Sequence, residues 1–172
     1  MLRHHLSLPA LALVLALPGT ALARSWQGIT PGSSTQADVV ARFGEPSTKG
    51  KLEGRTALVY KGEQAITGTR QAQFLVGDDG RVAEINVFPV LQLEKEAVLG
   101  TFGKEPQKTF TDDFRTVWFY RLIGVKVFFG KDGTVEAIRF QAAEMGAKPA
   151  PPAGAEPQES PPAAAGVPAA GK

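Results

Sequence analysis

The 172-residue sequence contains no cysteine, and its two histidines, His4 and His5, both stand near the amino terminus. We expect both histidines to be removed with a signal peptide, which leaves a mature chain with neither residue type. Disulfide bonds, zinc sites built on Cys or His, cysteine nucleophiles and Ser-His-Asp triads are then excluded. The absence of cysteine also removes the acceptor that a bacterial lipoprotein needs for its lipid.

Residues 1–23 have the pattern of a secretory signal peptide. Arg3 supplies a positive charge, residues 6–17 form an apolar run, and residues 21–23 offer a small-x-small cleavage site. An uncleaved membrane anchor is the alternative, although the apolar run is short for spanning a bilayer. The sequence therefore predicts a protein of the periplasm or the secreted fraction, with no stable membrane anchor after signal cleavage.

Clusters of charge of one sign are also missing. The formal net charge is +2, and positive and negative residues are interspersed along the chain. This pattern gives no basic patch for phosphate contacts, so we expect no nucleic-acid partner.

At the carboxy-terminal end, residues 146–172 hold seven of the 13 prolines among Ala and Gly, with Val167 as the only bulky apolar residue. Such a composition predicts a disordered Pro/Ala-rich tail.

A short helix with marked ends is predicted within residues 33–46. Ser34 or Thr35 can cap its first turn, and Asp38 lies three residues after Thr35, as in a capping box. Gly44 permits a left-handed helix end, and Pro46 prevents the helix from resuming. We expect the strand-rich remainder to pack against this helix and a second one of the same design.

The design occurs twice because the chain contains an internal repeat. Phe-Gly-Glu-Pro at 43–46 matches Phe-Gly-Lys-Glu-Pro at 102–106, and a tyrosine (Tyr60 or Tyr120) follows each proline by 14 positions. Further on, residues 74–85 match residues 127–138, with an Asp-Gly pair in each. Each copy predicts a helix, a strand ending in Tyr, a hairpin, a strand, an Asp-Gly turn and a last strand.

The first hairpin differs between the copies, because residues 61–70 form a longer connection than residues 121–124. The longer connection is interpreted as a tolerated insertion, with a contact element as the alternative.

These motifs resemble those of the SmpA/OmlA (BamE-like) domain family. They are Gly-x-x-Thr-x-x-Asp-Val at 32–39, which is one residue longer than the family's Gly-x-Ser/Thr-x-x-Asp/Glu-Val, Phe-Gly-x-Pro at 43–46, Trp118-x-Tyr120 and the Asp-Gly-x-Val turns. The tandem arrangement is similar to that of the β-lactamase inhibitor proteins. The resemblance implies helices on one face of an antiparallel sheet, an open opposite face, and binding of proteins or envelope components without catalysis. This chain departs from the family because it has no lipobox cysteine and because it has two units instead of one.

Together the repeat and the resemblance predict an α+β fold of two tandem units. The first unit spans residues 24–90 and the second spans residues 91–145. In each unit, short helices are expected to pack on one face of a small antiparallel sheet.

Four residues are candidates for protein binding. Trp118 and Tyr120 alternate with their neighbours along a strand, so both point to the same face. They are aromatic anchors if that face is the open one; the alternative is that they fill the core, because alternation alone does not identify the face. Phe88 and Arg139 on the final strands are the other candidates, and Arg139 is expected to point outward between Ile138 and Phe140.

We find no catalytic constellation in the sequence. The acidic pairs at 78–79 and 112–113 suit turns better than acid–base catalysis or calcium binding. We therefore expect no catalytic residue, cofactor or metal. The prediction is a non-enzymatic exported protein-binding module in outer-membrane or envelope assembly or maintenance, with an envelope protein as partner. The alternatives are an inhibitor of a secreted or periplasmic enzyme, such as a β-lactamase, and a hydrolase with a carboxylate site.

Overall fold

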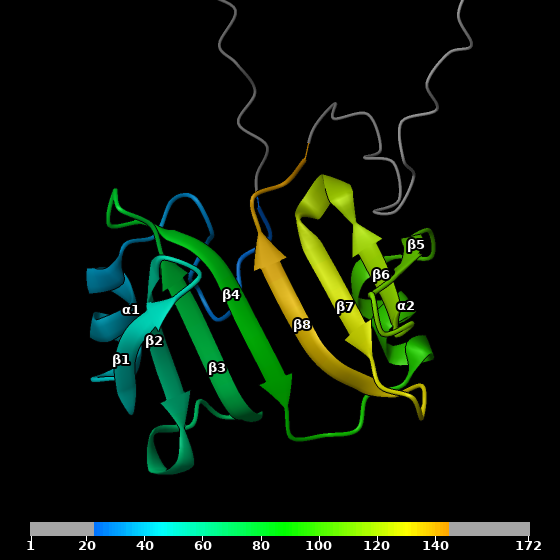
Figure 1. Ribbon diagram of the computed structural model, residues 1–172, viewed down its shortest axis with the longest axis horizontal. Coiled ribbons are helices and arrows are strands. Elements are labelled where there is room, and N and C mark those ends of the chain that lie inside the picture. The colour runs from blue at the N-terminus through cyan, green and yellow to red at the C-terminus, as the bar shows by residue number, and fades with distance from the viewer. Residues whose placement is uncertain (1–22, 145–172) are drawn as a thin grey trace, which may run out of the picture.

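A single eight-stranded antiparallel sheet organises residues 23–144, the part of the chain that the computed structural model describes (Figure 1). The predicted tail and, apart from Ala23, the predicted signal peptide lie outside these residues. The strand order is β1-β2-β3-β4-β8-β7-β6-β5. Strands β1–β4 therefore form one half of the sheet and β5–β8 the other, and the last strand of each half lies at the centre.

The first half begins with helix α1 (Gln36–Phe43). The predicted capping box is confirmed: the Thr35 side chain accepts a hydrogen bond from the Asp38 backbone N–H, and the Asp38 carboxylate accepts one from the Thr35 N–H at 2.8 Å. Gly44, with φ of 77°, follows the last helical residue. The strands of this half are β1 (Thr48–Leu52), β2 (Arg55–Lys61), β3 (Thr69–Val76) and β4 (Val82–Pro89).

The second half begins with helix α2 (Lys95–Phe102), whose N-cap residue Glu94 makes no capping hydrogen bond with its side chain. Its strands are β5 (Gln107–Phe110), β6 (Thr116–Tyr120), β7 (Val125–Phe129) and β8 (Val135–Gln141). Single 3₁₀ turns, η1 (Gly62–Gln64) and η2 (Arg121–Ile123), follow β2 and β6. Each half thus contains one helix followed by four strands.

The predicted fold class is wrong in one respect, since the two repeats do not build two small sheets. Residues 84–87 of β4 pair with residues 138–141 of β8, so the sheet continues through the centre of the molecule. Buried side chains of both halves form one hydrophobic cluster. The physical reason is that β4 and β8 each end a repeat with an unpaired edge, and pairing these edges satisfies their backbone groups.

Both helices pack on the same face of the sheet. Residues directly opposite each other on neighbouring strands share a face, and one such row runs through Leu58, Phe74, Ile85, Phe140, Val125 and Tyr120. All six side chains are buried. The ring of Phe43 in α1 lies 5.6 Å from that of Phe74, and the ring of Phe102 in α2 lies 5.6 Å from that of Tyr120. Figure 1 shows α1 at the β1–β2 end of the sheet and α2 at the other.

The two repeat tyrosines connect strand to helix in the same way. The Tyr60 hydroxyl donates to the carbonyl of Gly44 at 2.9 Å, and the Tyr120 hydroxyl donates to the carbonyl of Gly103 at 3.1 Å. Each carbonyl belongs to the residue that ends a helix. Burial raises the pKa of both phenols, and the nearby Glu45 carboxylate adds to the rise in the pKa of Tyr60. The phenols therefore remain neutral donors at physiological pH.

The halves differ in the connection that follows the tyrosine. In the first half, the longer connection places Ile66 in the hydrophobic cluster, and the indole of Trp26 packs 5.9 Å from the Phe74 ring. The second half has only η2, and a cavity of about 470 Å³ lies beside Phe102, Tyr120, Leu122 and Ile123. The first half has a cavity of about 460 Å³ beside Phe43, but polar side chains such as Arg42 and Glu63 form most of its lining, whereas the lining of the second-half cavity is mostly apolar.

Candidate functional site: the open face of the sheet

Neither of the two helices in residues 23–144 packs on the second face of the sheet. The row that crosses this open face runs through Val59, Gln73, Asn86, Arg139, Lys126 and Phe119, which lie opposite one another on successive strands. It alternates with the buried row, so its side chains point away from the helices. The open face is therefore defined by strand register.

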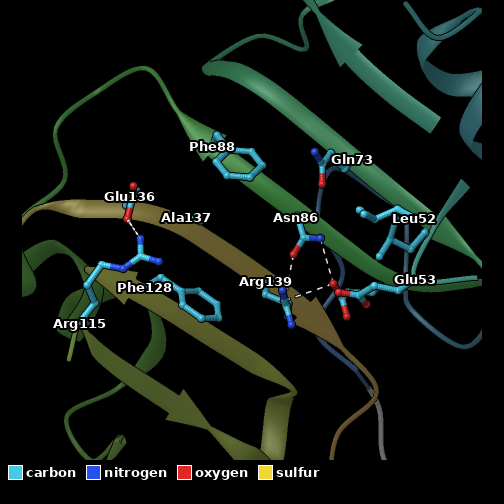
Figure 2. Close-up of a pocket in the computed structure, with 12 residues that line it drawn as sticks. Leu52, Glu53, Gln73, Asn86, Phe88, Arg115, Phe128, Glu136, Ala137 and Arg139 are labelled. Carbon is cyan, nitrogen blue, oxygen red and sulfur yellow. Dashed lines mark hydrogen bonds and ion pairs between the residues drawn. The ribbon is translucent and has the colours of Figure 1, made fainter. Parts of the chain in front are cut away.

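A polar network lies at the centre of the open face, where β4 meets β8 (Figure 2). The Asn86 amide donates to a Glu84 carboxylate oxygen at 2.9 Å, and Arg139 Nε lies 3.0 Å from Asn86 Oδ1 and 3.2 Å from Glu84 Oε1. Arg55 reaches the other Glu84 oxygen at 3.6 Å. Glu84 and Asn86 are each only 7% exposed, so their partners are needed to offset the loss of hydration.

Three phenylalanine rings on the open face each lie beneath a cation. The guanidinium carbon of Arg139 is 5.3 Å from the ring centre of Phe128, and that of Arg70 is 5.8 Å from the ring centre of Phe88. The Lys126 ammonium is 4.7 Å from the ring centre of Phe119. These distances are those of cation–π contacts, and the three rings are half-buried.

The network and two of the rings line a shallow cavity of about 280 Å³. Figure 2 shows Phe88 and Phe128 on either side of β8, with Arg139 and Asn86 beside them and Leu52, Glu53 and Gln73 toward β1 and β3. The rim at the other end is formed by Arg115 and Glu136. The cavity thus offers apolar walls and a few fixed polar groups, which is the composition of many binding sites.

The Arg115 rim is itself an ion-pair cluster. Arg115 Nε lies 2.8 Å from an Asp113 oxygen, and its terminal nitrogen pairs with Glu136. A hydrogen bond from the Thr111 hydroxyl, with a smaller contribution from the charge of Arg115, lowers the pKa of Asp113. The hydrogen bond to Glu136 and the two carboxylate charges raise the pKa of Arg115. Asp113 and Arg115 are therefore both charged at neutral pH.

Two of the four candidate binding residues lie away from the open face. Trp118 is 5% and Tyr120 is 7% exposed, and both belong to the hydrophobic cluster on the helix side. Of the two placements that the sequence left open, the core is the one observed, because the β6 register gives the open face to Val117 and Phe119, and the assignment of Trp118 and Tyr120 as binding anchors is corrected. Phe88 and Arg139 lie on the open face and line its cavity. Their role in binding stays a prediction.

Sequence reasoning missed Glu84, Asn86 and Phe128. A signal was present in β4, where Glu84, Asn86 and Phe88 alternate with the apolar residues Ile85 and Val87. Alternation of this kind indicates a strand with one buried and one open face. It does not indicate that a strand from the other repeat lies next to it, so the network with Arg139 was not visible.

The acidic pairs act in turns, as the sequence suggested. Asp79 Oδ1 accepts from the Arg81 backbone N–H at 3.1 Å, and Asp113 accepts from the Thr111 hydroxyl. Within residues 23–144, no group of three or more His, Cys, Asp and Glu side chains has the arrangement of a metal site. Neither α1 nor α2, the two α-helices of the described chain, has the length and hydropathy needed to span a bilayer.

Comparisons with known proteins identify a similar fold. No protein-family model matches the chain, and no curated protein matches it. A crystal structure of a DUF4309 family protein, YjgB from Bacillus subtilis subsp. subtilis str. 168, is similar with a TM-score of 0.52 at 23% sequence identity. The similarity covers 67% of this chain and 83% of that chain. At this identity the similarity supports the fold and carries no information on function.

Proposed function

We propose that this protein is an exported, non-enzymatic module that binds another protein through the open face of its sheet. The observation that carries the proposal is the mixed chemistry of that face. The face combines half-buried phenylalanine rings, each covered by a cation, with a central network of ion pairs. Aromatic side chains and arginine are enriched in the centres of protein interfaces, where they contribute most of the binding energy.

The polar centre of the face is fixed before any partner binds. Glu84, Asn86 and Arg139 hold one another through hydrogen bonds and ion pairs, and Glu84 and Asn86 are largely buried. Side chains that are already immobile lose little conformational entropy when a partner covers them. This favours a role in recognition of a specific surface.

The proposed setting is the cell envelope. The pattern of residues 1–23 predicts export, and the resemblance of the repeat motifs implies proteins that act in envelope assembly or maintenance. The partner would then be an envelope protein that presents apolar side chains to the phenylalanine rings and hydrogen-bonding groups to Glu84 and Arg139.

Site-specific photo-crosslinking of the full chain in the cells that produce it tests this proposal. Benzoylphenylalanine replaces Phe88 or Phe128 on the open face, and replaces Leu122 as a control that is 73% exposed beside the α2 cavity. The expected result is one envelope protein, identified by mass spectrometry, from both open-face positions and not from Leu122. Capture of a single soluble enzyme from those positions would favour the inhibitor alternative. Capture from Leu122 alone, or from none of the three, would contradict the proposal.

The identified partner is then purified, and its affinity is measured for the original chain and for Arg139→Ala. We expect the affinity to fall at least about tenfold, because the substitution removes the cation above Phe128 and one partner of Glu84. Lys104→Ala is the matched control, since it removes a positive charge beside the α2 cavity, away from the open face.

A further inference from the structure

Three tight turns of the molecule share one hydrogen-bond pattern. In each, a backbone N–H donates to the carbonyl four residues on: Gly77 to Arg81 at 2.8 Å, Gly130 to Thr134 at 2.8 Å and Thr111 to Arg115 at 3.0 Å. The fourth residue donates back to the first carbonyl at 3.0, 3.0 and 2.9 Å, respectively. This is a three-residue hairpin loop whose last residue is left-handed, a position that favours glycine.

The left-handed position is glycine in two of the three turns and phenylalanine in the third. The φ angles are 75° at Gly80, 84° at Gly133 and 61° at Phe114. The sequences Asp-Asp-Gly-Arg at 78–81 and Asp-Asp-Phe-Arg at 112–115 differ only at this position. A positive φ is strained for a residue as bulky as phenylalanine, so the third turn carries a conformational cost that the other two avoid.

Packing inside the molecule does not offset this cost, because the Phe114 side chain is 88% exposed. The turn nevertheless holds it in a defined position. The Thr111 hydroxyl accepts from the Arg115 backbone N–H at 3.0 Å, and Arg115 is fixed by Asp113 and Glu136. Since Arg115 and Glu136 line the open-face cavity, Phe114 stands next to its rim.

We propose that Phe114 is an anchor residue that inserts into an apolar pocket of the protein that covers the open face. This inference rests on the proposed function, and it adds a contact of Phe114 with the partner at the rim of the open-face cavity. The pocket would fit one phenyl ring and would have a basic rim, because the exposed Asp112 is adjacent to Phe114 in the turn. Burial of the Phe114 ring in the complex offsets the conformational cost of its positive φ, which no packing within the isolated chain offsets.

Two substitutions separate strain from recognition. Phe114→Gly gives the turn the sequence of residues 78–81, and it removes both the strain and the ring. We expect its melting temperature to rise by about 3 °C. Phe114→Ala removes the ring and keeps the positive φ, so its melting temperature should change by less than about 1 °C. A lower melting temperature for Phe114→Gly would show that the ring stabilises the isolated chain, and would overturn the proposal.

Binding is measured with the purified partner that the open-face crosslinks identify. We expect both Phe114 variants to lose about 30-fold in affinity, although one of them is more stable than the original chain. Unchanged affinity in both variants, with Arg139→Ala weakened, would overturn the anchor and leave the proposed function in place. Weakened affinity in both, with Phe88→Ala and Arg139→Ala unchanged, would support the anchor and reject the open face.

Discussion

The two halves of the sheet share their order of elements but close their helix-side cores differently. In the first half, Ile66 and Trp26 complete a cluster around Phe74. In the second half, the connection after Tyr120 is short, and a cavity of about 470 Å³ remains beside Phe102. A cavity of about 460 Å³ also lies beside Phe43 in the first half, but its lining is mostly polar, so the halves differ in how much apolar surface their cavities expose.

The exposed large hydrophobic residues of the described chain follow this division. Three of them, Phe110, Phe114 and Leu122, lie in the second half, whereas the first half has Leu52. Val90 and Leu91 lie in the connection between the halves. The second half therefore exposes more large apolar side chains than the first.

The largest effect is expected in the first-half core. Phe74→Ala removes a fully buried ring that contacts the rings of Trp26, Phe43 and Tyr60, and should lower the free energy of unfolding by about 4 kcal/mol. Urea unfolding measures the free energy of unfolding. Phe128→Ala on the open face is the control, and it should lower that free energy by about 1 kcal/mol. Because one cluster spans both halves, the loss should appear as one transition. Two separate transitions would show that the halves unfold independently.

The repeat tyrosines permit the same test in both halves. Tyr60→Phe and Tyr120→Phe each remove the hydroxyl that donates to a helix-ending carbonyl, and Tyr60→Phe should cost about 1.5 kcal/mol of stability by urea unfolding. Tyr120 lies beside the open cavity, where water can replace the lost donor, so its cost should be the smaller. A larger cost at Tyr120 would argue against the accessible second half.

The helix starts provide a smaller difference. Thr35→Ala removes the capping box of α1 and should cost about 1 kcal/mol, whereas Glu94→Ala at the start of α2 should change stability by less than about 0.5 kcal/mol. Thermal unfolding of both variants measures the two effects. Equal losses would mean that Glu94 caps α2 in solution.

The smallest effect concerns acid pH. The backbone N–H and the hydroxyl of Thr35 lower the pKa of Asp38 in the folded protein, whereas the pKa of an unfolded Asp is about 3.9. The stabilisation that the ionised Asp38 carboxylate gives the folded state is therefore complete above about pH 3.9, and it is lost as the pH falls through the pKa of Asp38 in the folded protein. Asp38→Asn should have a lower urea midpoint than the original chain at pH 6, and the difference should shrink below about pH 4. A constant difference would rule out titration of Asp38 as its cause.

Local signals predicted the first helix, because its capping residues and its end at Gly44 lie within a few positions of one another. The position of Tyr60 and Tyr120 after each proline likewise indicated a repeated strand end. Two features had no local signal. The pairing of β4 with β8 joins residues more than 50 positions apart, and strand alternation groups Trp118 with Tyr120 without showing which face is buried. The helices decide that face, since Phe102 of α2 packs against Tyr120.

The pairing of β4 with β8 has the symmetry of a dimer interface within one chain. Ile85 lies opposite Phe140 and Val87 lies opposite Ile138, while in the internal alignment Ile85 corresponds to Ile138 and Val87 to Phe140. Each repeat thus contributes the same two positions, as two subunits do across a twofold axis. Asn86 and Arg139 correspond to each other and meet on that axis.

In a dimer of identical subunits, the residue on the axis would face its own copy, and two arginines there would repel each other. Within one chain the position is free to differ, so Arg139 faces Asn86 and shares Glu84. The centre of the open face is therefore asymmetric although the sheet around it is nearly symmetric. A partner that contacts these central residues therefore has one binding orientation instead of two.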